Sequence, residues 1–80
     1  MTFGERLRQA REARRLTRDQ LAAASGVAHG TIHGYEMGRR APSFASAVRL
    51  AAALGLTCLD FAGCEDVAPE LLGEAERTGQ

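Results

Sequence analysis

His29 and His33 are four residues apart, a spacing that places two side chains on one face of a helix. Two imidazoles in this arrangement can contribute ligands to a metal site. The neighbouring sequence does not add the further ligands that would complete such a site. We therefore expect no metal and no other cofactor, and we interpret both histidines as polar residues that face solvent.

The two cysteines, Cys58 and Cys64, are too few and too close together to form the disulfide framework of a secreted protein. We interpret Cys58 as a small core residue at the start of a helix and Cys64 as a surface thiol. Neither is expected to have a redox or zinc role. No nucleophile stands in a recognisable arrangement with a base, so we expect that the protein is not an enzyme.

The basic residues are all arginines, and they are unevenly distributed although the formal net charge is zero. Residues 1–64 contain nine arginines and five acidic residues, whereas residues 65–80 contain one arginine and five acidic residues. A basic body with an acidic tail is typical of a domain that binds a polyanion. Arginine is also the better bidentate partner for phosphate.

The length of 80 residues allows one domain with a modest core. The composition is rich in alanine and has only four aromatic residues, which favours closely packed helices around an aliphatic core. No apolar run approaches the roughly 18 residues of a membrane span, and the N-terminal segment lacks the apolar core of a signal peptide. We expect an all-α protein of the cytoplasm with no membrane partner.

Five helices are predicted, at about residues 3–15, 18–24, 28–36, 44–54 and 58–62. Thr2 with Glu5, and Thr17 with Gln20, have the spacing of capping boxes at the first two helix starts. Glycines and Pro42 mark the breaks between later helices. The residues predicted to face inward are Phe3, Leu7, Ala10, Arg14, Leu21, Ala22, Ile32, Tyr35, Ala47, Leu50, Ala51 and Leu54.

The two short helices at 18–24 and 28–36, joined by a turn at Gly26, have the pattern of a helix-turn-helix. Ala22 is small where the second helix must cross the first, and Gly26 allows a sharp turn. Ile32 and Tyr35 attach the second helix to the core, which leaves its other face free to enter a DNA groove.

With these features the sequence resembles the Xre-type, phage-repressor-like helix-turn-helix regulators. The resemblance is carried by LRQAREARRLTRDQLAAASGV, TIHGYEMGRRAPS and AVRLAAALGLT, which lie within about residues 3–62. It implies a compact five-helix bundle, residues 1–63, that binds double-stranded operator DNA as a homodimer. It also implies a bacterial or phage protein of the cytoplasm.

The resemblance further implies three sets of residues. Arg11 and Glu36 would form a partly buried ion pair between the first and third helices. The residues implied as phosphate contacts are Arg18, Arg39 and Arg40. The residues implied on the exposed edge of the recognition helix, facing the bases, are Ala28, His29, Gly30, Thr31, His33 and Gly34.

Gly30 and Gly34 are unusual at these positions, because a glycine inside a helix costs roughly 1 kcal/mol relative to alanine and has no side chain with which to read a base. Small residues could let the helix lie deeper in the groove, with His29, Thr31 and His33 reading bases. Alternatively, specificity could come from DNA shape or from a partner. A third interpretation is that glycine is merely tolerated on a surface that no longer reads DNA.

The last part of the chain, residues 64–80, is an acidic tail that lies outside the resemblance and could contain a short helix. Together with the last predicted helix it offers more apolar surface than a small monomer exposes comfortably. This surface could be a dimer interface, a docking site for another protein, or a segment that folds back over its own domain. The residues concerned are Leu59, Ala62, Val67, Leu71 and Leu72.

We interpret the chain as a sequence-specific DNA-binding regulator of transcription, a repressor that binds its operator as a dimer with the third helix in the major groove. The alternative is a protein-interaction module, such as the antitoxin of a toxin–antitoxin pair, whose tail wraps a partner. A toxin-like reading frame beside the gene would favour this alternative.

Overall fold

A computed structural model describes residues 1–61 and 64, although not the side chains of Cys58 and Leu59, and this part of the chain is entirely helical. Its elements are α1 (Phe3–Ala13), α2 (Arg18–Ser25), α3 (His29–Glu36), α4 (Phe44–Ala53) and the 3₁₀ helix η1 (Cys58–Phe61). The first four match the predicted helices to within two residues. The prediction of five α-helices is wrong for the described residues, because the last element is a single tight turn of 3₁₀ helix.

Local capping sets the starts of the helices. Thr2 and Glu5 form a capping box at α1, and Thr17 and Gln20 form another at α2. At α4 the Ser43 hydroxyl accepts a hydrogen bond from the backbone N–H of Ser46, at 3.2 Å. These bonds satisfy backbone donors that have no partner within the helix, which is why the sequence alone located these three starts.

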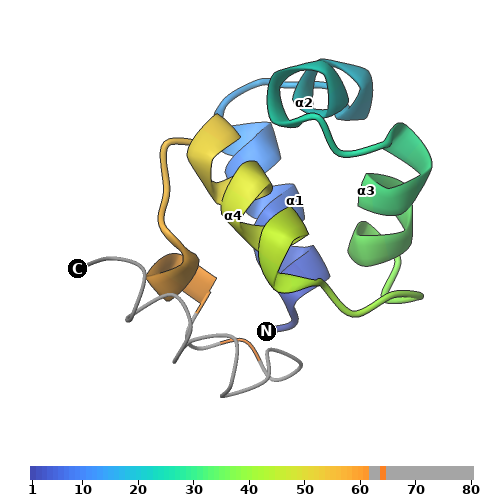
Figure 1. Cartoon of the computed structure of the whole chain (residues 1–80), viewed down its shortest axis with the longest axis vertical. Helices are drawn as coiled ribbons and strands as arrows, with labels where there is room; N and C mark the ends of the chain where they lie inside the picture. Colours follow the sequence, from blue (N-terminus) through green and yellow to red (C-terminus); the bar gives the residue numbers. More distant parts are fainter. Residues whose placement is uncertain (62–63, 65–80) are drawn as a thin grey trace.

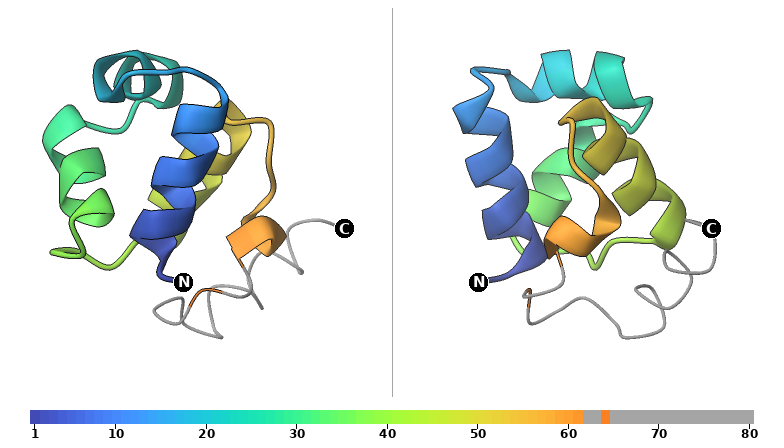
Figure 2. Two further views of the ribbon diagram at one scale, coloured as in Figure 1. Left: turned by 180° about the vertical axis from the view of Figure 1, so that it is seen from behind. Right: turned by 90° about the vertical axis from the view of Figure 1, so that its left-hand side faces the viewer.

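The arrangement of the helices places α3 on one side of the bundle, where it packs against α1 and α2 (Figure 1). In the two further views α2 lies across one end of the bundle, and it packs against α4 as well as α3 (Figure 2). The turn η1 lies at the opposite end of the bundle from α2, near the start of α1 (Figures 1 and 2). No helix in the described part of the chain is long and apolar enough to cross a membrane.

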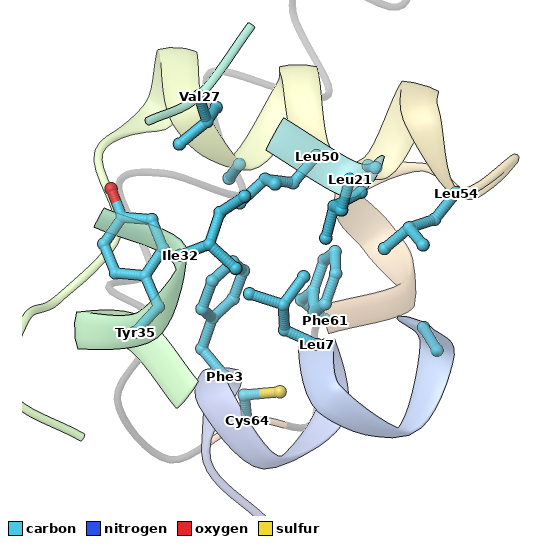
Figure 3. Close-up of a cluster of buried hydrophobic side chains, with 13 residues drawn as sticks. Phe3, Leu7, Leu21, Val27, Ile32, Tyr35, Leu50, Leu54, Phe61 and Cys64 are labelled. Carbon is cyan, nitrogen blue, oxygen red and sulfur yellow. The ribbon is translucent and has the colours of Figure 1, made fainter. Parts of the chain in front are cut away.

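The core combines aliphatic side chains with three aromatic rings, those of Phe3, Tyr35 and Phe61 (Figure 3). The ring of Phe3 lies 5.6 Å from that of Tyr35 in an edge-to-face arrangement, and 4.7 Å from that of Phe61. Such pairs add to the free energy gained by burying the rings. Phe3 therefore joins α1, α3 and η1. The large side chains that are almost completely buried are Phe3, Phe61, Leu7, Leu21, Ile32, Leu50 and Leu54.

Two predictions about individual side chains are wrong. Cys64 is buried in the same cluster as Phe3, not exposed at the surface, because η1 directs the chain back over the core (Figure 3). Arg14 is exposed, and the inward position on that face of α1 belongs to Arg11. The Arg14 guanidinium instead reaches Gly55, where an added Cβ would contact it.

The close approach of α1 and α3 depends on Gly4, which sequence reasoning did not single out. An added Cβ at this position would collide with the backbone carbonyl oxygen of Tyr35. Any larger residue would push the two helices apart. Gly4 thus sets the distance between α1 and the helix that carries the candidate site.

Candidate nucleic-acid interface

The turn between α2 and α3 is fixed by three successive residues. Gly26 has φ 73°, in the left-handed region that glycine adopts at little cost. The Ser25 hydroxyl accepts a hydrogen bond from the backbone N–H of Val27 at 3.1 Å, and the Val27 side chain is buried. This geometry joins two eight-residue helices at a sharp angle, the arrangement of a helix-turn-helix.

Ile32 and Tyr35 hold α3 against the core and thereby define its outer face. Both side chains are buried, at 0% and 4% exposure. Since each residue turns the helix by about 100°, residues 30, 34 and 37 lie opposite them. Gly30 is exposed there, and so is Met37, the residue that follows α3, so within the helix itself this outer face is formed by Gly30 and Gly34, which have no side chains.

The six residues predicted to face the bases do not share one environment. Ala28, His29 and Gly30 are exposed, and Thr31 and His33 are partly buried. Gly34 is buried, which corrects its placement on the exposed edge. The reason is that the side chain of Arg40 lies over it: an added Cβ at Gly34 would be 3.2 Å from Cδ and 3.3 Å from Cγ of Arg40.

The start of α3 has no side-chain cap, because Ala28 occupies the N-cap position. His29, the first residue of the helix, has its Nδ1 atom 3.9 Å from a carboxylate oxygen of Asp19 on α2. Both side chains are well exposed. No group of three His, Cys, Asp or Glu side chains that could hold a metal ion occurs among residues 1–61 and 64.

Glu36, the last residue of α3, is the centre of a buried charge cluster. Its side chain is 1% exposed and that of Arg11 is 10% exposed. Arg11 donates from Nε to Oε2 of Glu36 at 2.8 Å and from Nη2 to Oε1 at 3.0 Å. The structure therefore brings together the two residues expected to form an ion pair. Arg11 also donates from Nη1 to the carbonyl oxygen of Leu16 at 2.8 Å, which ties the α1–α2 loop to the same cluster.

Arg18 also binds Glu36, a contact that sequence reasoning missed. Its Nε atom lies 3.1 Å from Oε1 of Glu36, and its side chain is 31% exposed. Arg18 was expected to contact phosphate alone. In the structure it is anchored at the start of α2 by the same carboxylate that anchors Arg11, with part of its side chain at the surface.

The charge cluster shifts the pKa values of Glu36 and Arg11. Burial by itself raises the pKa of the Glu36 carboxyl, but hydrogen bonds and charges from Arg11 and Arg18 outweigh burial, so this pKa lies below its ordinary value of 4.5. The hydrogen bond to Glu36 is the main cause that raises the pKa of Arg11. Arg11 and Glu36 are therefore both charged at neutral pH. With Arg18 bound to the same carboxylate, the cluster holds α1, α2 and α3 in a fixed relation.

Arg39 and Arg40 are exposed in the loop after α3. This loop is folded against the end of the helix: Gly38 has φ 73°, and the backbone N–H of Arg39 donates to the carbonyl oxygen of Gly34 at 2.8 Å. Both arginines are thus held close to the outer face of α3. The residues expected to form an interface fall elsewhere: Ala62, Val67, Leu71 and Leu72 lie outside the described residues, and so does the side chain of Leu59.

Comparison with known proteins places this geometry in context. A family model for a helix-turn-helix domain matches residues 2–60. The uncharacterized HTH-type transcriptional regulator RghRB of Bacillus subtilis (strain 168) is 47% identical over 53 residues, which cover 65% of this chain and 38% of that protein. This chain thus spans well under half the length of that curated relative.

A solved structure is similar as well. The restriction-modification controller protein C.AhdI from Aeromonas hydrophila superposes with a TM-score of 0.70 and is 36% identical. The match covers 72% of this chain and 88% of C.AhdI.

Proposed function

This chain belongs to the Xre-type helix-turn-helix family, and from that membership we propose that it is a transcriptional regulator, a repressor that binds operator DNA as a homodimer. In this proposal α3 enters the major groove of double-stranded DNA. The observation that carries it is the outer face of α3, where Gly30 is exposed and does not pack against the described core. Arg18 is bound to Glu36 at the end of α3, and Arg39 and Arg40 lie in the loop that follows this end.

The division of roles follows from where the side chains lie. His29, Thr31 and His33 surround the outer face and can hydrogen-bond to base edges, while Ala28 and Gly30 allow close approach. The arginines beside the helix supply affinity that does not depend on sequence, because each neutralises a phosphate and releases a counterion. Residues 1–63 form the DNA-binding domain, and the acidic tail would supply a dimer interface or a docking site for a protein partner.

Similarity to a restriction-modification controller and to a transcriptional regulator supports a regulatory role. A dimer with two copies of α3 would bind two half-sites about one helical turn, roughly 10 base pairs, apart. The expected operator is therefore close to a palindrome.

The experiment is a selection of bound sequences from a random pool of duplex DNA with the full chain, followed by titration of the enriched site at several salt concentrations. We expect a two-fold symmetric site and a steep loss of affinity with salt. Arg39→Ala should lower the salt slope by about 1. Arg8→Ala is the matched control, because Arg8 is exposed on α1 and pairs with Glu12, and it should leave the slope unchanged. No enrichment, together with no binding at low salt, would overturn the proposed function.

A further inference from the structure

Gly34 is buried although it lies on the outer face of α3. It follows Ile32, which points into the core, by two residues and so lies about 200° around the helix from it. A residue on that side would normally be exposed. What covers Gly34 is the stem of Arg40, which lies across the position that a side chain at residue 34 would occupy.

The contact is close along the whole stem of Arg40. An added Cβ at Gly34 would lie 3.2 Å from Cδ, 3.3 Å from Cγ and 3.6 Å from Nε. Nε belongs to the guanidinium group, so this group begins at the surface of α3. The backbone contributes to this placement, because the hydrogen bond from Arg39 to the carbonyl of Gly34 returns the loop over the end of the helix.

We propose that Arg40 reads a guanine through the outer face of α3, in the place of a side chain that the helix itself lacks. This inference rests on the proposed function, since it assumes that α3 enters the major groove. It changes the role of Arg40, which the sequence indicated as a phosphate contact. An arginine guanidinium makes two hydrogen bonds to O6 and N7 of guanine, the commonest specific contact in the major groove.

One observation favours a base over a phosphate as the partner of Arg40, and a second shows that the same face is open to an approaching base pair. Its stem is packed on Gly34, on the outer face of α3, whereas phosphates would flank that face if α3 lay in the major groove. Gly30, one turn before Gly34, has nothing within 4 Å of an added Cβ, so the same face has room for a base-pair edge to approach.

The first test compares two neighbouring arginines in the selection from random DNA. Arg40→Ala should lose preference at one guanine of each half-site, with a roughly ten- to hundredfold drop in discrimination at that position. Arg39→Ala is the matched control and should weaken binding to all sequences alike. Arg40→Lys should restore only part of the preference, since lysine lacks the bidentate fork. If Arg40→Ala also weakens all sequences alike and lowers the salt slope by about 1, Arg40 is a phosphate contact and the assignment is overturned.

The second test changes one atom of the DNA, the N7 nitrogen of the selected guanine. Replacing the selected guanine by 7-deazaguanine removes the N7 acceptor. The wild-type chain should then bind roughly tenfold more weakly, and Arg40→Ala should bind the two DNAs equally. An equal loss in both proteins would overturn the assignment while leaving the proposed function intact. If the wild-type chain bound no DNA at all, the proposed function would fail, and this assignment with it.

Discussion

The guanidinium of Arg11 and the carboxylate of Glu36 form two hydrogen bonds, at 2.8 and 3.0 Å, that join the first helix to the end of the third. Because Arg18 shares the same carboxylate at 3.1 Å, one buried acid links all three helices on which the candidate interface is built. Their relative positions determine where the outer face of α3 and the nearby arginines meet DNA. The cluster thus affects the proposed DNA binding by positioning the helices, although none of its side chains is proposed to contact a base.

The first prediction concerns removal of this acid. Glu36→Ala leaves two arginines without their carboxylate, one of them nearly buried, and should lower the free energy of unfolding by roughly 3 kcal/mol. Glu12→Ala is the matched control: its pair with Arg8 is more than half exposed on both sides, so the cost should be below about 1 kcal/mol. Chemical denaturation of both variants gives the comparison. A double-mutant cycle between Arg11 and Glu36 that shows no coupling would contradict this account.

The second prediction is a pH dependence. The pKa of Glu36 is lowered in the folded state, so its contribution to stability is complete above its ordinary pKa of 4.5 and is lost as pH falls through the lower, folded value. Denaturation of the wild-type chain and of Glu36→Gln between neutral and acidic pH should give curves that converge in acid. A constant difference between the two curves down to low pH would show that Glu36 is not the group responsible.

The third prediction concerns Gly4, where an added Cβ would collide with the Tyr35 carbonyl oxygen. Gly4→Ala should destabilise the protein by roughly 1–3 kcal/mol, the cost of overpacking a tight contact. The obstacle is backbone, which cannot move aside as a flexible side chain can. Thermal unfolding measures the effect, and a variant as stable as the wild type would mean that α1 and α3 can separate at little cost.

The sequence predicted the starts of α1, α2 and α4 well because local bonds fix them. The Thr2–Glu5 and Thr17–Gln20 boxes and the Ser43 cap each involve residues three apart, so their effect can be read from the chain itself. The inward positions of Ile32 and Tyr35 also follow from helical periodicity.

The remaining features depend on contacts between distant segments, which periodicity does not specify. Nothing local indicates that Gly4 meets Tyr35 or that Arg18 shares Glu36 with Arg11. Cys64 is buried because η1 turns the chain back, and the polar residues around it gave no sign of this. The burial of Gly34 could not be predicted either, because Arg40 covers it only through the path that the loop after α3 takes.

The last prediction separates the two glycines of the recognition helix. Gly30→Ala adds a methyl group where nothing lies within 4 Å, so it should stabilise the helix by roughly 1 kcal/mol. Gly34→Ala should gain less, because its Cβ would press on the Arg40 stem at 3.2 Å. In an Arg40→Ala background that obstacle is gone, and Gly34→Ala should then gain as much as Gly30→Ala. Thermal unfolding of these four variants and the wild type tests this, and equal gains from Gly34→Ala in both backgrounds would show that Arg40 does not lie over Gly34 in solution.

Combining Gly30→Ala with Gly34→Ala in one chain gives a variant that also tests DNA binding. If the glycines are only tolerated, a variant with a more stable helix should bind DNA at least as well as the wild type. A variant that is more stable but binds DNA more weakly must therefore have lost affinity through a change at the interface. We expect this combination for the Gly30→Ala, Gly34→Ala double variant, because the methyl group at residue 30 lies on the face proposed to approach the bases and the one at residue 34 presses on the Arg40 stem. Titration of the selected operator decides the matter. Unchanged affinity with raised stability would mean that close approach is not the reason for the glycines.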